Sequence, residues 1–150
     1  MEKEKIICIS GGADFLHCGH IRMINDAAKY GKIIWILNSD KWLKTKKGYL
    51  LMSWEDRAEI LRSIRNIFDV VAVEDEQGGT VCEALARIKP DYFGKGGYSN
   101  EFNTPEYKFC QENGIEVIFG LGGPKVKSAA EMIDEVVNSL VKKLDRILKG

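Results

Sequence analysis

The sequence lacks the features that would place it outside the ordinary globular proteins. It has no net charge, because 22 Lys and Arg residues balance 22 Asp and Glu residues over 150 positions. A neutral chain offers no overall attraction to nucleic acid or to an anionic membrane, so we expect neither as a partner. The chain has no apolar run long enough to span a bilayer, and its charged N-terminus is unlike a signal peptide. We therefore expect a cytoplasmic protein.

The sequence also lacks a paired or zinc-type arrangement of cysteines. The four cysteines are Cys8, Cys18, Cys82 and Cys110, and they form no C-x-x-C pair and match no zinc-site spacing. We expect reduced thiols, as is usual in the cytoplasm.

Five short runs rich in Ile, Val and aromatic residues alternate with segments of helical pattern. Such runs are typical of strands buried on both faces of a parallel sheet. They cover residues 5–10, 32–37, 69–73, 91–93 and 115–119. Helices are expected over residues 19–30, 53–65, 79–88, 104–113 and 128–149. The alternation predicts one α/β domain over residues 1–150, with a Rossmann-like, doubly wound, five-stranded parallel sheet and a long C-terminal helix.

Residue types at the helix ends support two of these boundaries. Ser53 and Asp56 have the spacing of a capping box. Thr104 precedes Pro105 in the order of an N-cap and first helical residue, and Gly114 is a stop signal.

The last helix carries an apolar stripe. Ile133, Val137, Leu140, Leu144 and Ile147 are spaced by 4, 3, 4 and 3 residues, which is a heptad-like pattern. The commoner cause is one amphipathic helix packed on its own sheet. The alternative is a contact between two copies in a homodimer, because the helix is longer than a five-stranded sheet needs.

Residues suited to anion binding gather after the first strand. Ligands of an open parallel sheet bind beyond the carboxyl ends of its strands. There the sequence places Gly11 and Gly12, followed by His17, Gly19 and His20. Glycine lets backbone approach a ligand, and the next helix begins here with unpaired N–H groups. The pattern predicts a phosphate site.

Zinc is the competing explanation for the two histidines. A pair three residues apart can ligate zinc, but Asp14 or Cys18 would have to supply a further ligand. No metal ligand is assigned.

The H-x-G-H segment of residues 11–20 resembles the signature of the cytidylyltransferase-like nucleotidyltransferase superfamily. Similar motifs recur along about residues 5–133. They are Asn38-Ser39-Asp40, the M-S-W-E-D-R-A-E-I-L segment of residues 52–61, Lys95-Gly96-Gly97 and the loop of residues 122–128. The motifs are most similar to those of the heptose-1-phosphate adenylyltransferase domain and, further off, glycerol-3-phosphate cytidylyltransferase.

The resemblance implies transfer of a nucleoside monophosphate from ATP or CTP to a phosphorylated sugar or polyol. A heptose-1-phosphate-like acceptor is the first choice, a glycerol-3-phosphate-type reaction is the alternative, and the product would be an activated glycan precursor. The acceptor phosphate would attack the α-phosphorus in line and release pyrophosphate. Mg²⁺ would come bound to the nucleotide phosphates. The protein would orient two polyanions and offset their charge.

The same resemblance assigns roles to residues. The implied catalytic residues are His17, His20 and Lys95. The implied nucleotide-binding residues are Gly11, Gly12, Asp14, His17, Gly19, His20, Lys95, Gly96, Lys125, Lys127 and Ser128. The implied acceptor-binding residues are Asp40, Lys44, Lys46, Lys47 and Arg57.

Several of these residues have a structural explanation as well. Asp14 could position its loop through backbone bonds, and Arg57 could pair with a carboxylate. The three lysines could form a solvated face, and Trp35, Trp42 and Trp54 suit packing better than base stacking.

The chain departs from the family pattern at four places. Ala13 replaces a frequent aromatic residue, which would loosen the nucleotide pocket. Ala129 and Ala130 follow Ser128 where the family offers hydroxyls, and binding would weaken about tenfold or more unless Lys125 and Lys127 compensate. Tyr98 stands where an aspartate is common, and the 65–69 segment is one residue longer.

The missing hydroxyls and the long helix leave open a non-catalytic nucleotide-binding or assembly module. A pantetheine, nicotinamide or flavin phosphate is a further possible acceptor. An oxidoreductase is disfavoured, since no G-x-G-x-x-G follows the first strand.

Overall fold

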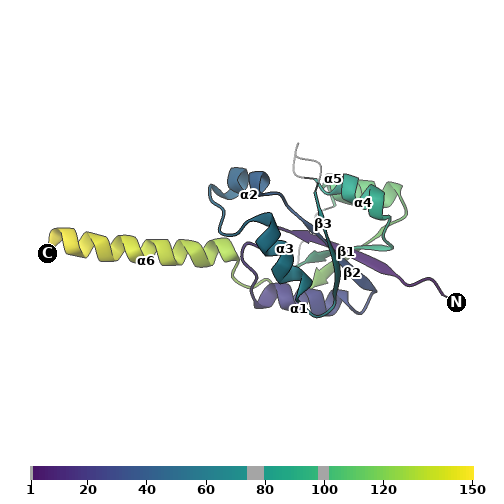
Figure 1. Ribbon diagram of the computed structural model, residues 1–150, viewed down its shortest axis with the longest axis horizontal. Coiled ribbons are helices and arrows are strands. Elements are labelled where there is room, and N and C mark those ends of the chain that lie inside the picture. The colour runs from purple at the N-terminus through teal and green to yellow at the C-terminus, as the bar shows by residue number, and fades with distance from the viewer. Residues whose placement is uncertain (1, 74–79, 98–101) are drawn as a thin grey trace.

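The computed structural model describes residues 2–73, 80–97 and 102–150. Five parallel strands form one sheet in the order β3-β2-β1-β4-β5 (Figure 1). They are β1 (Ile6–Gly11), β2 (Lys32–Leu37), β3 (Ile67–Ala72), β4 (Tyr92–Gly96) and β5 (Glu116–Leu121). The predicted doubly wound α/β fold is confirmed. From β1 the chain first adds strands on one side (β2, β3) and then on the other (β4, β5). The carboxyl ends of β1 and β4 therefore mark the switch point of the sheet, where a crevice opens.

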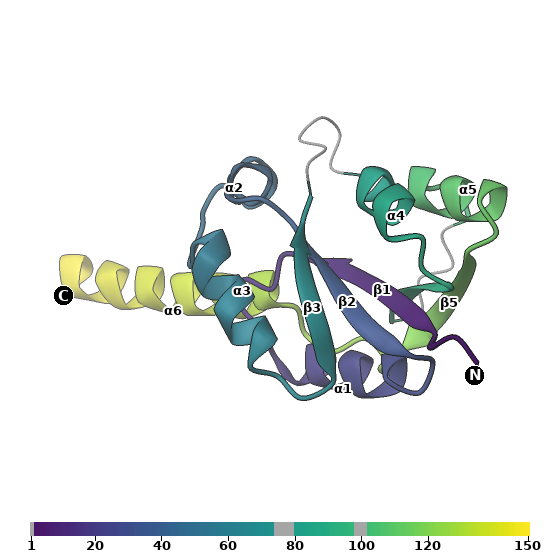
Figure 2. The same cartoon turned by 45° about the vertical axis from the view of Figure 1, so that its right-hand side comes forward.

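Helices cover both faces of the sheet (Figure 2). On one face lie α1 (Cys18–Ala27) and α3 (Trp54–Arg62), which pack Ile24 and Leu61 onto Ile9 and Trp35. On the other face lie α4 (Cys82–Ile88) and α5 (Pro105–Glu112), which pack Leu85 and Cys110 against Ile36 and Phe93. The central strands are therefore buried on both sides, as their continuous apolar runs predicted.

The two predicted helix caps, Ser53 and Thr104, are confirmed, and Ser128 is a third cap that was not predicted. The side chains of Ser53, Thr104 and Ser128 accept the backbone N–H groups of the residues three positions on, at 3.2, 3.2 and 3.1 Å. Each bond satisfies an N–H group that the first helical turn leaves unpaired.

One helix was missed. Residues 40–47 form α2 (Asp40–Lys47), which begins at the N-cap Ser39 and ends at Gly48 in the left-handed region. Only Leu43 of this helix is buried, so its sequence has almost no apolar periodicity. No helix was predicted for this lysine-rich segment for that reason. Position 79, at the start of another predicted helix, lies outside the described residues.

The last helix, α6 (Ala129–Lys149), projects from the body of the domain (Figures 1 and 2). Every residue from 134 to 150 is exposed. The expectation of a helix packed along its own sheet is therefore wrong beyond the first turn. Among the described residues, no helix is both long and apolar enough to cross a membrane.

Candidate functional site

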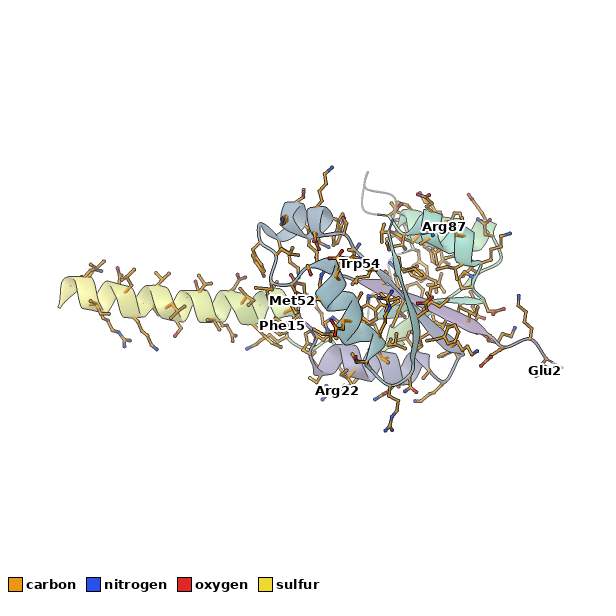
Figure 3. All side chains as sticks on the ribbon, in the orientation of Figure 1. Glu2, Phe15, Arg22, Met52, Trp54 and Arg87 are labelled. Carbon is orange, nitrogen blue, oxygen red and sulfur yellow. The ribbon has the colours of Figure 1, made fainter. Side chains whose placement is uncertain are left out.

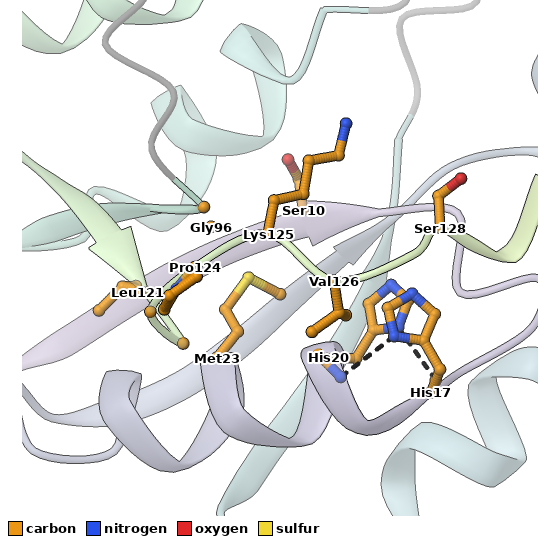
Figure 4. A pocket seen from close by; sticks show the side chains of 14 residues that line it. Ser10, His17, His20, Met23, Gly96, Leu121, Pro124, Lys125, Val126 and Ser128 are labelled. Carbon is orange, nitrogen blue, oxygen red and sulfur yellow. Dashed lines mark hydrogen bonds between the residues drawn. The ribbon is translucent and has the colours of Figure 1, made fainter. Parts of the chain in front are cut away.

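A cavity of about 870 Å³ opens at the switch point of the sheet. This is within the usual size range of small-molecule pockets, about 300–1,000 Å³. Figure 4 shows the two histidines and Ser128 toward one end and Leu121 and Gly96 toward the other. Its lining residues come from β1, the start of α1, the end of β4, the end of β5 and the β5–α6 loop: Ser10, His17, Gly19, His20, Met23, Gly96, Gly97, Leu121, Gly122, Gly123, Pro124, Lys125, Val126 and Ser128.

His17 and His20 form a reciprocal cap at the start of α1. His17 Nδ1 accepts the backbone N–H of Gly19 at 3.1 Å, and His20 Nδ1 accepts the backbone N–H of His17 at 3.1 Å. The ring centroids are 4.1 Å apart. Because each Nδ1 accepts a bond, the proton of each neutral ring is at Nε2. The cap therefore leaves two Nε2–H groups as donors at the cavity.

Both imidazoles are held in the neutral form. Burial lowers the pKa of His17. The pKa of His20 is lowered to about 4, chiefly by burial, and further by repulsion from Lys47 and from His17 when His17 is protonated. The histidines thus act near neutral pH as hydrogen-bond donors without a full charge.

Gly19 is required by the close packing around this cap. A Cβ at Gly19 would lie 2.5 Å from Val126 Cγ2 and 2.8 Å from His17 Cε1. The β5–α6 loop thus passes directly over the start of α1.

A carboxylate on α1 holds the same loop. Asp26 Oδ2 accepts the backbone N–H of Gly122 at 2.8 Å, and this bond is the main cause of the lowered pKa of Asp26. Gly122 has φ +84°, in the left-handed region, and an added Cβ there would meet the Met23 nitrogen at 2.9 Å. Neither Asp26 nor Gly122 was identified from the sequence as part of the site.

The start of α6 forms another part of the cavity wall. Ser128 lines the cavity, and its hydroxyl caps the helix through Glu131. The backbone N–H groups of Ala129 and Ala130 follow Ser128 in the first turn, where a helix offers them no acceptor of its own. Such N–H groups at the start of a helix suit an anion.

The cavity brings together six of the predicted nucleotide-binding residues: His17, Gly19, His20, Gly96, Lys125 and Ser128. Gly11 and Gly12 lie outside its lining. A Cβ at Gly11 would be 3.3 Å from the Trp35 ring, and one at Gly12 would be 2.6 Å from Leu43 Cδ2. Because Gly11 and Gly12 have no side chain, the Trp35 ring and the Leu43 side chain can pack against their backbone.

Asp14 positions a loop. It is 2% exposed, and its oxygens accept the backbone N–H groups of Leu51 and Met52 at 2.9 and 3.0 Å. The structural explanation left open for Asp14 is the one that the geometry supports. Ala13 is buried in the adjacent core and is not among the residues that line the cavity.

Lys95 and Lys127, which were predicted to bind the nucleotide, also lie outside the lining of the cavity. Lys95 stands close enough to Cys110, on the α4–α5 face, to lower the pKa of that thiol, although burial raises it overall to about 11. Lys127 pairs with Glu135. The departure at Tyr98 lies outside the described residues.

The buried Arg57 links α3 to the segments that follow β1 and β2, and it pairs with the partly exposed Asp40. Arg57 is 0% exposed, and its guanidinium donates to the carbonyls of Gly12, Asn38 and Met52 at 2.7, 2.9 and 3.1 Å and to Asp40 at 2.6 Å. Its expected contact with the acceptor is not supported, because these partners occupy the side chain.

The lysines of α2 differ in their surroundings. Lys47 Nζ donates to the Asp14 carbonyl at 3.2 Å. The positive charge of Lys47 is near enough to His20 to lower the pKa of that imidazole. Lys46 lies over the Trp42 ring at 4.5 Å, and Lys44 is exposed. Lys47 is thus the lysine of this set that the structure places beside the histidine pair.

The tryptophans contribute to packing, as expected. Trp35 is fully buried and donates to the Gly11 carbonyl at 3.1 Å, and Trp54 donates to the Leu37 carbonyl at 3.2 Å.

The chain is similar to known proteins over most of its length. A family model described as cytidylyltransferase-like matches residues 8–120. The bifunctional protein HldE of Aliarcobacter butzleri is 36% identical over 97 residues, which are 63% of this chain and 20% of that protein. The FAD synthase of Pyrococcus abyssi is 37% identical over 92 residues, or 60% of this chain and 61% of the synthase. The chain thus spans about a fifth of this HldE relative.

A solved structure shares the fold. It is the lipopolysaccharide core biosynthesis protein from Thermoplasma volcanium, with a TM-score of 0.63 and 19% identity over 79% of this chain and 95% of that one.

Proposed function

Since this chain belongs to the cytidylyltransferase-like family of nucleotidyltransferases, we propose that it transfers a nucleoside monophosphate from a nucleoside triphosphate to a small phosphorylated acceptor. The observation that carries the proposal is the reciprocal cap of His17 and His20, which presents two Nε2–H donors at the cavity. The first turn of α6 adds backbone donors at the same cavity. Hydrogen-bond donors are what a transferring phosphoryl group needs, because its oxygens gain charge in the transition state.

The proposed reaction is an in-line displacement. An oxygen of the acceptor phosphate attacks the α-phosphorus, the bond from the α-phosphorus to the bridging oxygen breaks, and pyrophosphate leaves with the electron pair. His17 and His20 hold the α-phosphoryl oxygens and the bridging oxygen. Lys47 offsets charge beside His20, and the start of α6 holds the outer phosphates.

ATP is the preferred donor in this proposal. The name of the FAD synthase relative describes a product in which adenylate is joined to a flavin phosphate. The resemblance to heptose-1-phosphate adenylyltransferase domains favours the same donor. CTP is the alternative, with glycerol-3-phosphate as acceptor.

The preferred acceptor is a heptose-1-phosphate-like sugar phosphate, which yields an activated glycan precursor. The HldE relatives, of which three besides that of Aliarcobacter butzleri are 32–38% identical over the same length of 97 residues, favour it. A flavin phosphate is the second candidate, because FAD synthase is equally similar over a larger share of its own length.

Mg²⁺ is proposed to enter as part of the substrate. The described cavity lining offers the hydroxyls of Ser10 and Ser128 but no carboxylate. Within residues 2–73, 80–97 and 102–150, no three His, Cys, Asp or Glu side chains group as a metal site. The ion suits this cavity as the complex with the triphosphate, where it offsets phosphate charge. We also propose a cytoplasmic location, where nucleoside triphosphates are abundant, and a homodimer, whose interface is argued below.

A pyrophosphate-release assay tests the proposal. ATP and CTP are each combined with Mg²⁺ and with heptose-1-phosphate, glycerol-3-phosphate or flavin mononucleotide. Acceptor-dependent release with ATP and the heptose phosphate supports the preferred reaction, and release with another pair replaces it. If no pair reacts although the protein binds a nucleotide, the non-catalytic module is the better account.

A further inference from the structure

An apolar face of α6 lies open along most of the helix. Val137, Leu140, Leu144 and Ile147 are 49, 57, 55 and 76% exposed. The side chains of α6 stand in open space on the ribbon (Figure 3). A contiguous exposed apolar surface of this kind marks an interaction site in a soluble protein.

The helix also needs such a contact in order to remain folded. Helices in water are marginal when isolated, and most of their stability in proteins comes from packing of the apolar face. From residue 134 to the end, α6 buries no residue against the domain. A partner that covers the face would provide the missing packing.

Charge is divided along the same helix. Glu131, Asp134 and Glu135 lie in its first two turns. Four basic residues lie in its second half, with Asp145 among them: Lys142, Lys143, Arg146 and Lys149. The two halves are thus of opposite sign, and the acidic and basic residues of α6 balance.

We propose that α6 pairs with α6 of a second copy of this chain, antiparallel, with the two helices crossing near Leu140. In this arrangement the acidic half of each helix lies beside the basic half of the other. The 4-3-4-3 spacing supplies the apolar seam that two helices share. Three further exposed apolar residues flank this seam and widen the contact: Val136, Val141 and Leu148. In a parallel pair, like charges would face each other at both ends.

The same features disfavour a lipid surface. An amphipathic helix that lies on an anionic membrane carries basic residues along its polar face. Here the polar face has no net charge, and half of it is acidic. The charge pattern of α6 is instead complementary to that of a second, antiparallel α6.

Sedimentation of the whole chain between about 1 and 100 µM tests the pairing. We expect a monomer–dimer equilibrium in the wild type, with helicity measured by circular dichroism falling on dilution. Leu140→Glu should raise the dimer dissociation constant at least tenfold. The matched control is Asn138→Glu, which adds the same charge on the polar side of the helix and should leave the constant within about threefold.

The orientation is tested by reversing charges. Glu131→Lys with Asp134→Lys should weaken self-association, and so should Lys143→Glu with Arg146→Glu, each by about tenfold at low salt. All four changes together should restore self-association, because each acidic half again meets a basic half. If the half-reversals do not weaken the dimer, the antiparallel arrangement is wrong.

Two outcomes would overturn the proposal altogether. One is a monomer at every concentration with unchanged helicity. The other is a monomer that binds vesicles containing anionic lipid, which would make the face a membrane contact. Nucleotide titration serves as the control for folding of the variants at Asn138, Leu140, Lys143 and Arg146, which lie outside the cavity lining. Thermal melting is the control for the variants with Glu131→Lys, because this residue lies in the first turn of α6 beside Ser128.

Discussion

His20 Nδ1 accepts the backbone N–H of His17, and His17 Nδ1 accepts the backbone N–H of Gly19. The same two side chains therefore end the first loop and direct their remaining N–H groups to the cavity. Structural and chemical roles are combined in one pair of rings. Their substitution must be designed so that the two roles separate.

Replacement of His17 by asparagine separates its role as a helix cap from its role as a donor at the cavity. The amide oxygen of asparagine can accept the Gly19 N–H, so His17→Asn should keep the melting temperature within a few degrees. His17→Ala loses the cap and should destabilise the protein by about 1 kcal/mol. Both variants lack the Nε2–H donor and should lower turnover by about 10²–10³-fold, the loss typical of one transition-state donor. Steady-state kinetics and thermal melting check both effects, and near-normal turnover in His17→Asn would show that the ring is structural.

The protein should become less stable on acidification, because His20 of the histidine cap is held neutral in the folded chain. The pKa of His20 is about 4 in the folded chain, below its ordinary value of 6.5. The unfolded chain binds more protons between these values, so the free energy of unfolding decreases as pH falls from about 6.5 to about 4. Urea unfolding across this range measures the slope. His20→Asn, which can accept the same bond without titrating, should flatten it, and an unchanged slope would assign it to other groups.

Gly19→Ala should disturb the site more than the fold. The added Cβ would meet Val126 and the His17 ring at less than 3.0 Å, so one of them must move. We expect nucleotide affinity to fall about tenfold or more, the effect of losing one charge-assisted hydrogen bond. Calorimetric titration measures it, with Gly48→Ala as a control at a glycine where no atom lies within 4 Å. The control carries its own backbone strain, because Gly48 has φ +81°, so its melting temperature is compared as well. Equal affinities in all three proteins would contradict the close packing at Gly19.

Arg57→Met should act on stability. The guanidinium is buried with four acceptors, and its removal leaves three carbonyls and Asp40 without this donor. Breaking such a buried cluster is expected to destabilise the fold by about 3–5 kcal/mol. Arg62→Met, at an exposed position of the same helix, should have a much smaller effect. A stable Arg57→Met variant with a raised KM for the acceptor would instead restore the role in acceptor binding.

The fold was largely predictable because apolar runs dominate it. The β2 bounds match the prediction, since this strand is buried almost throughout. The edge strand β3 begins two residues earlier than expected, because half-exposed positions such as Phe68, 60% exposed, blur its pattern. The projection of α6 could not be predicted, since its stripe would look the same against a sheet.

The site was predictable where motif residues line the cavity, as with His17, His20 and Ser128. The pairing of Arg57 with a carboxylate was one of the two explanations left open, and Asp40 is that partner. The burial of Arg57 was not predicted, because it depends on carbonyl groups far away in sequence. Asp26 was missed because its bond to Gly122 joins α1 to a loop 96 residues away, and no local pattern signals such a contact.

The most direct test is a calorimetric titration of the purified chain with ATP and with CTP, each with Mg²⁺, in parallel with the His17→Asn variant. Binding requires no knowledge of the acceptor, so it isolates the cavity itself. We expect ATP to bind the wild type with micromolar affinity and the variant at least tenfold more weakly. Absence of binding to either nucleotide at millimolar concentration would contradict the assignment of this cavity as a triphosphate site.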